Sequence, residues 1–371
     1  MKEINIAKTL IAKRKEKGIT QDELANYIGV SKASVSKWET AQSYPDITFL
    51  PQLATYFNIS VDELIDYAPQ MTKDDIRKLY HRLSTTFSNQ PFDSVLAECR
   101  EIIKKYYSCF PLLLQMVVLL INHFMLAKEK ELQEEILKEI IDLCIRIKTE
   151  SNEVWLVKQA NSIEAIAQLV LQNPKEVLEL LDGTMKPTSD DEPLLANAYQ
   201  MIGDMQKAKE VLQISTYRQL MGIIGNSTLL LLQYTNETTK FEVLIHRILT
   251  MADMFNIDKL HPNAMLQFYY AAAQGYTLQG ITEKALDMLK KYADTCTMDF
   301  FPFILHGDEF FDSIDNWFSE FDLGKGAPRD EKFIKDSMLH GVVDNPTFVA
   351  LADQPRFKSI IESMKLKLGG N

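Results

Sequence analysis

The fold is decided by the stretch "TQDELANYIGVSKASVSKWE", residues 20–39, in which two short helical patterns surround one glycine. Thr20 and Glu23 have the spacing of a capping box, in which each side chain accepts a hydrogen bond from the other residue's backbone amide. Gly29 ends the first helix, because glycine adopts the left-handed backbone conformation at low cost. Ser31 is placed to cap the second. We therefore expect helices over 21–28 and 32–39, joined by a tight turn.

The apolar residues indicate which face of each helix is buried. Leu24, Ala25 and Ile28 share one face of the first helix. Val35 and Trp38 share one face of the second, which leaves its polar and small side chains facing outward. A helix, a tight turn and a helix within residues 20–39 have the dimensions of a helix-turn-helix motif.

Cap and breaker signals extend this unit in both directions. Gly18 closes a preceding helix, Pro45 precedes a following one, and Ser60 with Glu63 can cap a further one. The five expected helices span residues 4–17, 21–28, 32–40, 47–57 and 61–65. Pro69 interrupts the helical pattern in "DYAPQMTKDD", residues 66–75, where Thr72 and Asp75 can cap the next helix. We therefore expect two domains, residues 1–68 and 69–371.

Composition limits the class of protein. The chain has 371 residues, 46% of them hydrophobic, and a net charge of -11. Residues 1–58 hold eight Lys and Arg against six Asp and Glu, a net of +2, so the acidity lies in the remainder. Acidic bulk suppresses nonspecific DNA binding while one small basic face can still dock.

The sequence also favours a cytoplasmic protein that does not enter a membrane. The first 17 residues are charged and lack the apolar core of a secretory signal, and the longest apolar run, residues 111–121, is far shorter than a bilayer span. We expect this run to form a buried helix. The four cysteines are widely spaced without a CxxC pair, so we expect no disulfide and no metal site.

Helical periodicity dominates after residue 72, and two segments repeat one pattern. In residues 196–212 and 272–289 a small residue is followed at the same spacings by Tyr, Gly, Ala and Leu. The matching positions are Ala196, Tyr199, Gly203, Ala208 and Leu212 in one, and Ala273, Tyr276, Gly280, Ala285 and Leu289 in the other. This pattern indicates a two-helix hairpin with glycine in the turn.

Weaker copies surround these segments. Gln168 and Tyr234 occupy the position of Tyr199 and Tyr276, at successive separations of 31, 35 and 42 residues. Repeats of roughly 34 residues are typical of tetratricopeptide units. We expect an all-α protein in which the N-terminal domain is followed by a right-handed superhelix of degenerate tetratricopeptide-like hairpins. An irregular helical bundle is the alternative.

The N-terminal residues resemble the Cro/repressor, or XRE-like, helix-turn-helix family. The resemblance is carried by "TQDELA" at 20–25, Gly29, "VSKASVSKWE" at 30–39 and Pro45, and it covers about residues 4–66. It implies a five-helix, lambda-repressor-like domain whose helix after the turn enters the major groove of double-stranded DNA. It also implies that Arg14 and Glu39 form an ion pair between the first and third helices.

The outward residues of the motif are the candidate DNA contacts. Lysine can donate to guanine, serine can donate or accept, and an alanine methyl can contact the thymine methyl. The candidate base readers are Lys32, Ala33, Ser36 and Lys37. The candidate phosphate contacts are Thr20, Gln21, Ser31 and Ser34, near helix N-termini. The alternative for these residues is a structural role as a helix cap or a solvated surface group.

The whole architecture resembles the peptide-responsive regulators of the Rgg, PlcR and PrgX type. That resemblance implies a short peptide in the concave groove of the helical repeats and a homodimer that reads a pseudo-palindromic operator. The groove positions selected by hairpin spacing are Asn197, Gln200, Tyr270 and Gln274. Amide side chains can pair with an extended peptide backbone. The alternative is that these side chains are solvated or bond between helices.

Two rival functions remain. An enzyme is disfavoured, because "HGDE" at 306–309, His246 and "GKG" at 324–326 match no catalytic or phosphate-binding motif. We therefore expect no catalytic residues and no cofactor. A constitutive repressor or antitoxin-like protein, whose helical domain binds a partner protein, is the second rival.

Overall fold

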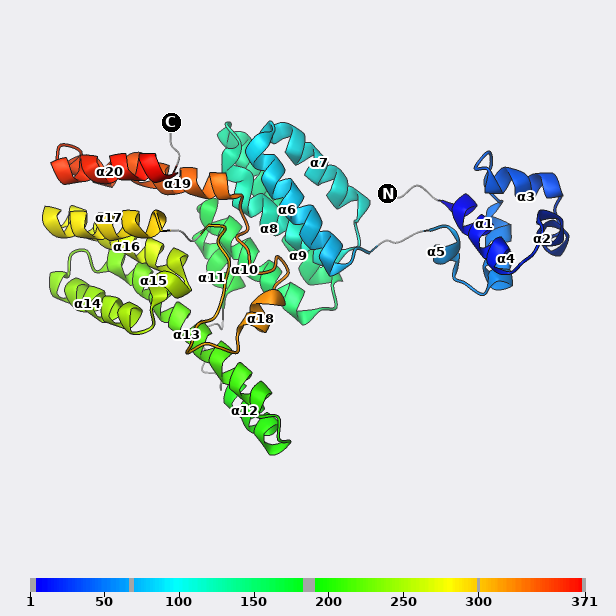
Figure 1. Cartoon of the computed structure of the whole chain (residues 1–371). Coiled ribbons are helices and arrows are strands. Elements are labelled where there is room, and N and C mark those ends of the chain that lie inside the picture. The colour runs from blue at the N-terminus through cyan, green and yellow to red at the C-terminus, as the bar shows by residue number, and fades with distance from the viewer. Residues whose placement is uncertain (1–4, 67–69, 183–190, 299–300, 369–371) are drawn as a thin grey trace. The chain divides into compact units, whose positions relative to one another are not determined.

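The computed structural model describes residues 5–66, 70–182, 191–298 and 301–368 (Figure 1). Over these residues the regular elements are helices, and the β pairing among them is one isolated bridge between Ile304 and Gly326. The all-α prediction is therefore confirmed. None of the described helices is both long enough and apolar enough to cross a bilayer.

The chain divides into two compact units, one of residues 1–76 and 93–173, the other of residues 77–92 and 174–371. The predicted boundary near residue 68 stays a prediction, because residues 67–69, including Pro69, lie outside the described residues.

The N-terminal region has the five predicted helices around one core. They are α1 (Ile6–Glu16), α2 (Gln21–Ile28), α3 (Lys32–Glu39), α4 (Leu50–Phe57) and α5 (Val61–Leu64). The core contains Leu10, Leu24, Val35, Trp38 and Leu53, all of them buried. Val35 and Trp38 therefore fix the inner face of α3, as their spacing predicts.

The caps of these helices are the ones that the sequence indicates. Glu23 N lies 3.2 Å from Thr20 Oγ1, and Thr20 N lies 2.7 Å from Glu23 Oε2. Ser60 and Glu63 form a second capping box at α5. Gly29 has φ = 82°, a backbone conformation that most side chains avoid.

The fourth helix differs from the prediction at its start. A 3-10 turn, η1 (Ile47–Phe49), precedes α4, and Asp46 caps it by accepting from Thr48 N at 3.0 Å. Pro51 lies in the first turn of α4, where its missing N–H leaves no helical hydrogen bond unmade.

The remaining helices of the first unit form a separate core. They are most of α7 (Phe92–Lys105), α8 (Phe110–His123), η2 (Phe124–Leu126), α9 (Lys130–Glu150) and α10 (Val154–Val170). The predicted buried helix is α8, in which Leu112 to Val117, Leu119, Leu120 and His123 are buried. Lys148 on α9 and Glu164 on α10 form a largely buried ion pair at 2.7 Å. All four cysteines of the chain are free and buried.

The second unit includes a stack of helices, α14, α16, α17 and α20 (Figure 1). It contains α6 (Lys73–Asn89) from Arg77 onward, α11 (Pro174–Leu180), α12 (Glu192–Met201), α13 (Met205–Gln233), α14 (Thr238–Met254), α15 (Ile257–Leu260), α16 (Pro262–Leu278), α17 (Thr282–Cys296), α18 (Asp315–Ser319), α19 (Glu331–Val343), η3 (Pro346–Leu351) and α20 (Pro355–Leu368). Helix α16 packs on both α13 and α17, and α20 covers α17.

The two best sequence repeats are both helical hairpins. Gly203 turns the chain between α12 and α13 with φ = 84°, and Gly280 does so between α16 and α17 with φ = 73°. The second hairpin buries all four of its other repeat positions, whereas in the first Leu212 is exposed. The same spacing therefore fixes the hairpin but not the depth at which it lies in the core.

Helix α13 is longer than the repeats suggest. It runs for 29 residues and pairs with α12 at one end and α14 at the other. Gly222 and Gly225 lie within it without ending it. One helix thus serves two neighbouring hairpins, so no turn separates Leu212 from the weaker copy that contains Tyr234.

Candidate nucleic-acid interface

The tight turn between α2 and α3 fixes the candidate DNA-binding surface. After Gly29, Ser31 caps α3 by accepting from Ser34 N at 3.1 Å. The buried pair Val35 and Trp38 then sets the rotation of α3 about its axis. The opposite face carries Lys32, Ala33 and Lys37, all exposed, with Ser36 half-buried beside them.

The predicted base-reading lysines differ in their surroundings. Lys32 Nζ lies 2.7 Å from Asp22 Oδ2 on α2, an exposed ion pair between the two helices of the motif. Such surface pairs stabilise by only about 0–1 kcal/mol, so Lys32 can leave Asp22 for a stronger acceptor. Lys37 is exposed near the end of α3.

The predicted phosphate contacts are also structural groups. Thr20 holds the capping box of α2, and Ser31 Oγ lies 2.9 Å from Ser34 Oγ. The backbone bond that Thr20 donates, with one from its hydroxyl, holds the pKa of Glu23 below its ordinary value. This carboxylate therefore remains charged beside the N-terminus of α2, where a phosphate is predicted to bind.

Gln21 is half-buried and takes part in an ion-pair network. Its Nε2 donates to Glu39 Oε2 at 2.9 Å. Arg14 donates to the same carboxylate through Nε to Oε1 at 2.6 Å and through Nη2 to Oε2 at 2.9 Å. Arg14 Nη1 also donates to Ile19 O at 2.9 Å. The predicted bridge between the first and third helices is thus confirmed, and Gln21 belongs to it.

The pKa of Glu39 reflects this network. Burial by itself favours the protonated form, but hydrogen bonds from Arg14 and Gln21, with the positive charges of Arg14 and Lys15, outweigh burial and hold the pKa below its ordinary value. Glu39 is therefore an anion at neutral pH. It fixes α3 to α1 from the inner side of the motif.

Sequence reasoning missed one candidate contact at the end of the recognition surface. Tyr44 follows α3 and is 62% exposed. The turn that carries it is closed by Gln42 N and Ser43 N, both of which donate to Lys37 O. A tyrosine hydroxyl can contact a phosphate. The available signal was an aromatic residue in a polar loop, "TAQSYPD", directly after α3.

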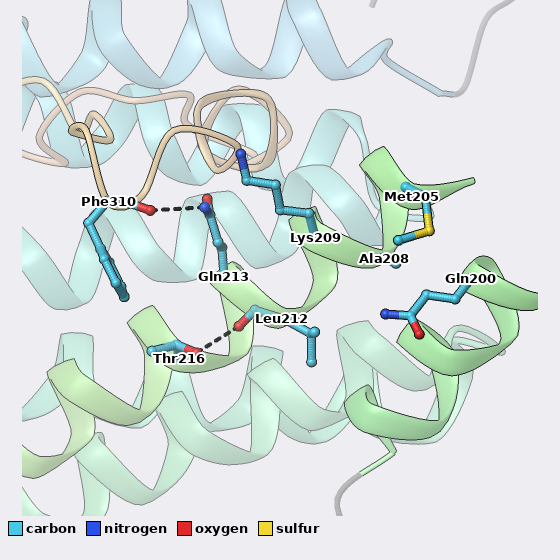
Figure 2. A pocket seen from close by; sticks show the side chains of 8 residues that line it. All are labelled: Gln200, Met205, Ala208, Lys209, Leu212, Gln213, Thr216 and Phe310. Carbon is cyan, nitrogen blue, oxygen red and sulfur yellow. Dashed lines mark hydrogen bonds between the residues drawn. The ribbon is translucent and has the colours of Figure 1, made fainter. Parts of the chain in front are cut away.

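A second candidate site lies between α12, α13 and the segment near Phe310 (Figure 2). It is a pocket of about 330 Å³ with a mixed apolar and polar lining. The lining residues are Gln200, Met205, Ala208, Lys209, Leu212, Gln213, Thr216 and Phe310. Of the four predicted ligand residues, Gln200 lines it, Asn197 is exposed on α12, and Gln274 is half-buried on α16.

Tyr270 is half-buried on α16, where its hydroxyl and ring have partners within the chain, and its predicted ligand contact stays a prediction. Its hydroxyl donates to Gly341 O at 2.7 Å and accepts from Asn345 Nδ2. Its ring packs against Tyr292 and Phe348. Helix α19 and η3 cover this face of α16, which makes Tyr270 part of the core contact between them.

In the described part of the chain no cluster of three or more His, Cys, Asp or Glu residues is arranged to hold a metal ion. His306 is exposed, and its Nδ1 lies 2.8 Å from Gly307 O. The "GKG" segment pairs with residues 304 and 305 through backbone contacts.

Comparisons with known proteins agree with this geometry at the N-terminus. Residues 10–64 match the family model described as Helix-turn-helix. The chain is 31% identical over 74 residues to the HTH-type transcriptional activator BcrR of Enterococcus faecalis, a match that spans 18% of this chain and 36% of that protein.

Two solved structures align with most of the chain, but their TM-scores are low. The apo form of the competence regulator ComR from Streptococcus vestibularis is 15% identical, with 83% of this chain and 95% of that chain covered at a TM-score of 0.24. Apo ComR from S. thermophilus is 14% identical, with 79% and 94% covered at a TM-score of 0.22. Chains at these scores superpose poorly as whole bodies. The family match concerns the N-terminus: residues 10–64 of this chain are a helix-turn-helix domain, as their XRE-like pattern predicts.

Proposed function

We propose that this protein is a sequence-specific DNA-binding transcriptional regulator. The observation that carries the proposal is the orientation of α3, whose inner face is fixed by Val35 and Trp38 and whose outer face presents Lys32, Ala33 and Lys37. A helix held in this way after a tight turn is the element that enters the major groove in helix-turn-helix proteins.

The candidate side chains of the helix-turn-helix motif divide between base reading and positioning. Lys37 and Lys32 are the base-reading candidates, because an ammonium group can donate to guanine O6 and N7. Thr20, Ser31 and Ser34 lie at the N-termini of α2 and α3, where hydroxyl and backbone N–H groups can meet phosphate oxygens. Asp22 competes for Lys32, so the pairing of Lys32 with DNA must break an exposed ion pair.

The regulator acts as a homodimer on a pseudo-palindromic operator. One helix-turn-helix domain makes few base contacts, whereas two domains on successive major grooves, about 34 Å apart, combine their affinities. The acidic helical region after residue 69 supplies the dimer contact, since its charge makes it a poor DNA ligand.

The helical region binds a short peptide or another ligand that changes DNA affinity. Hairpins such as α12/α13 and α16/α17 can change curvature when a ligand binds between them, and a ligand shifts the equilibrium only as far as it prefers one state. The exposed amides Asn197 and Gln200 on α12 support a peptide, because amides pair with an extended backbone. The protein acts in the cytoplasm, where the operator lies.

The test is binding of the full chain to an operator selected from random duplexes, with a scrambled duplex beside it. Lys37→Ala should weaken specific binding by about 1–3 kcal/mol and binding to the scrambled duplex by much less. Lys367→Ala, an exposed lysine on α20, is the matched control. Equal losses on both duplexes would make Lys37 a phosphate contact, and no loss would refute the assignment of the outer face.

The spacing of the half-sites tests the dimer. Five added base pairs between half-sites should abolish tight binding, and about ten should partly restore it, because two domains of one dimer need the same face of the duplex. Binding that ignores the spacing would refute the dimer. Affinity that no peptide or cell extract changes would favour the constitutive repressor with a partner protein.

A further inference from the structure

Residues 307–328, here named the connecting segment, lie between α17 and α19 in the chain and contain one short helix, α18. One end of this segment is hydrogen-bonded to α13. Gln213 Nε2 donates to Phe310 O and to Asp312 Oδ1, both at 2.9 Å, and Ser313 N donates to Gln213 Oε1 at 2.8 Å. Side chains of α13 therefore hold residues 310–313 in place.

A carboxylate of the chain itself binds two of the side chains that line the pocket, Lys209 and Gln213. Asp312 Oδ2 is 2.6 Å from Lys209 Nζ. Hydrogen bonds from Lys209, Gln213 and Ser313 lower the pKa of Asp312 to about 2, so it is an anion at neutral pH. Lys209 and Gln213 thus form a carboxylate-binding pair that an exposed side chain of the connecting segment occupies.

The open part of the pocket begins beside this pair. Figure 2 shows Lys209 and Gln213 on one side and Gln200 reaching from α12 on the other. Met205, Leu212 and Phe310 provide apolar surface in the lining of the pocket. The pocket therefore offers a cationic and amide end for a carboxylate, an apolar wall for a side chain, and an amide at its rim for a backbone group.

The other end of the connecting segment is held by α6, the first helix after the helix-turn-helix domain in the chain. The Arg77 guanidinium donates to Phe321 O at 2.6 Å and to Asp322 O at 2.9 Å. Tyr80 Oη and Ser84 Oγ both donate to Pro328 O, at 3.0 and 3.1 Å. One segment thus joins the pocket to α6 through backbone carbonyls.

We propose that this pocket binds the C-terminal carboxylate of a short apolar peptide, which replaces the carboxylate of Asp312 on Lys209 Nζ and Gln213 Nε2. The inference rests on the proposed function, since it names the ligand end and the site of a peptide-responsive regulator. Displacement of Asp312 breaks its bonds to Lys209 and Gln213 and so weakens the attachment of residues 310–313 to α13. Because the same segment is bonded to α6, the change reaches the helix that follows the DNA-binding domain.

The test is calorimetry on the full chain with N-acetyl-Leu-Leu as free acid and as C-terminal amide. The acid should bind about tenfold more tightly, because only it can accept charge-assisted hydrogen bonds from Lys209. Lys209→Met should remove this preference. Asp312→Asn, which weakens the internal competitor, should tighten binding of the acid several-fold. Lys240→Met, an exposed lysine paired with Glu237 on α14, should change nothing.

Three results would overturn the proposal: no binding of either probe, equal binding of acid and amide, or a preference that survives Lys209→Met. Octanoate serves as a further probe in the same calorimetry. If it binds as tightly as the peptide acid, the claim that the ligand is a peptide is refuted. Hydrogen exchange should become faster in residues 307–328 when the acid binds. Operator titration of the same preparation separates the two claims, because failed DNA binding refutes the proposed function and leaves the probe result intact.

Discussion

The ion pair between Arg14 and Glu39 can be tested by a double-mutant cycle. The Glu39 side chain is 4% exposed and that of Arg14 is 15% exposed. Arg14→Met keeps the apolar stem but leaves the carboxylate with Gln21 as its remaining side-chain donor. Loss of one partner of a buried pair costs about 3–5 kcal/mol, because the other charge stays buried without compensation.

The double variant Arg14→Met/Glu39→Met should cost far less than the sum of the two single variants. Both charges are then gone, and methionines fill the space with flexible apolar atoms. We expect a coupling energy of about 2–3 kcal/mol, the upper part of the range for residues in one network. Additive costs, within about 0.5 kcal/mol, would refute the claim that the pair acts as a unit.

The pH dependence of the unfolding free energy tests the same ion pair independently, because its direction should reverse in the variant. In the wild type the pKa of Glu39 is below the ordinary value of 4.5, so its stabilisation is present above that value and is lost as pH falls through the folded pKa. Arg14→Met removes the main opposing hydrogen bonds and leaves burial, which raises the pKa. In that variant the contribution of Glu39 should be present below pH 4.5 and lost as pH rises.

Denaturant unfolding followed by Trp38 fluorescence measures these energies in the full chain. Trp38 lies in the core of the N-terminal region, and Trp155 and Trp317, the other two tryptophans, are replaced by phenylalanine in every variant. The signal then reports this region. An unchanged pH profile in Arg14→Met would contradict the assigned cause of the low pKa.

Three further predictions concern the helical region. Gly275→Ala should destabilise it by about 1–3 kcal/mol, since the new Cβ would lie 2.4 Å from the ring of Phe241, whereas Gly222→Ala, with nothing within 4 Å, should stabilise by about 0.5–1 kcal/mol in the same melts. Tyr217→Phe should raise the melting temperature, because the buried hydroxyl has no hydrogen-bond partner among the described residues; a lower melting temperature would reveal a bonded group. The four buried cysteines should resist maleimide at neutral pH until the protein unfolds, as burial and Glu164 raise the pKa of Cys144 to about 12; rapid labelling of the native protein, read by mass spectrometry, would contradict this.

Local structure was predictable from the sequence wherever a few adjacent residues determine it. The capping boxes at Thr20 and Ser60 and the turns at Gly29, Gly203 and Gly280 depend on contacts within one helical turn or on one backbone angle. Spacing could therefore identify them. The length of α13 could not be found in this way, because its glycines are tolerated by packing on other helices and no local signal marks the absence of a turn.

The candidate sites also contain some features that the local sequence predicts and others that depend on residues far apart in the chain. The outer face of α3 follows from Val35 and Trp38, since residues that share a helix also share its periodicity. The contacts of Tyr270 with α19 and η3 could not be found in this way, because periodicity gives a face of one helix and not the element that covers it. Gln213 and Asp312 are 99 positions apart, and only the folded chain brings the carboxylate to Lys209. A ligand site built from such distant residues must be sought among side chains that already satisfy one another, because a competing ligand has to offer the same chemistry as the group that it displaces.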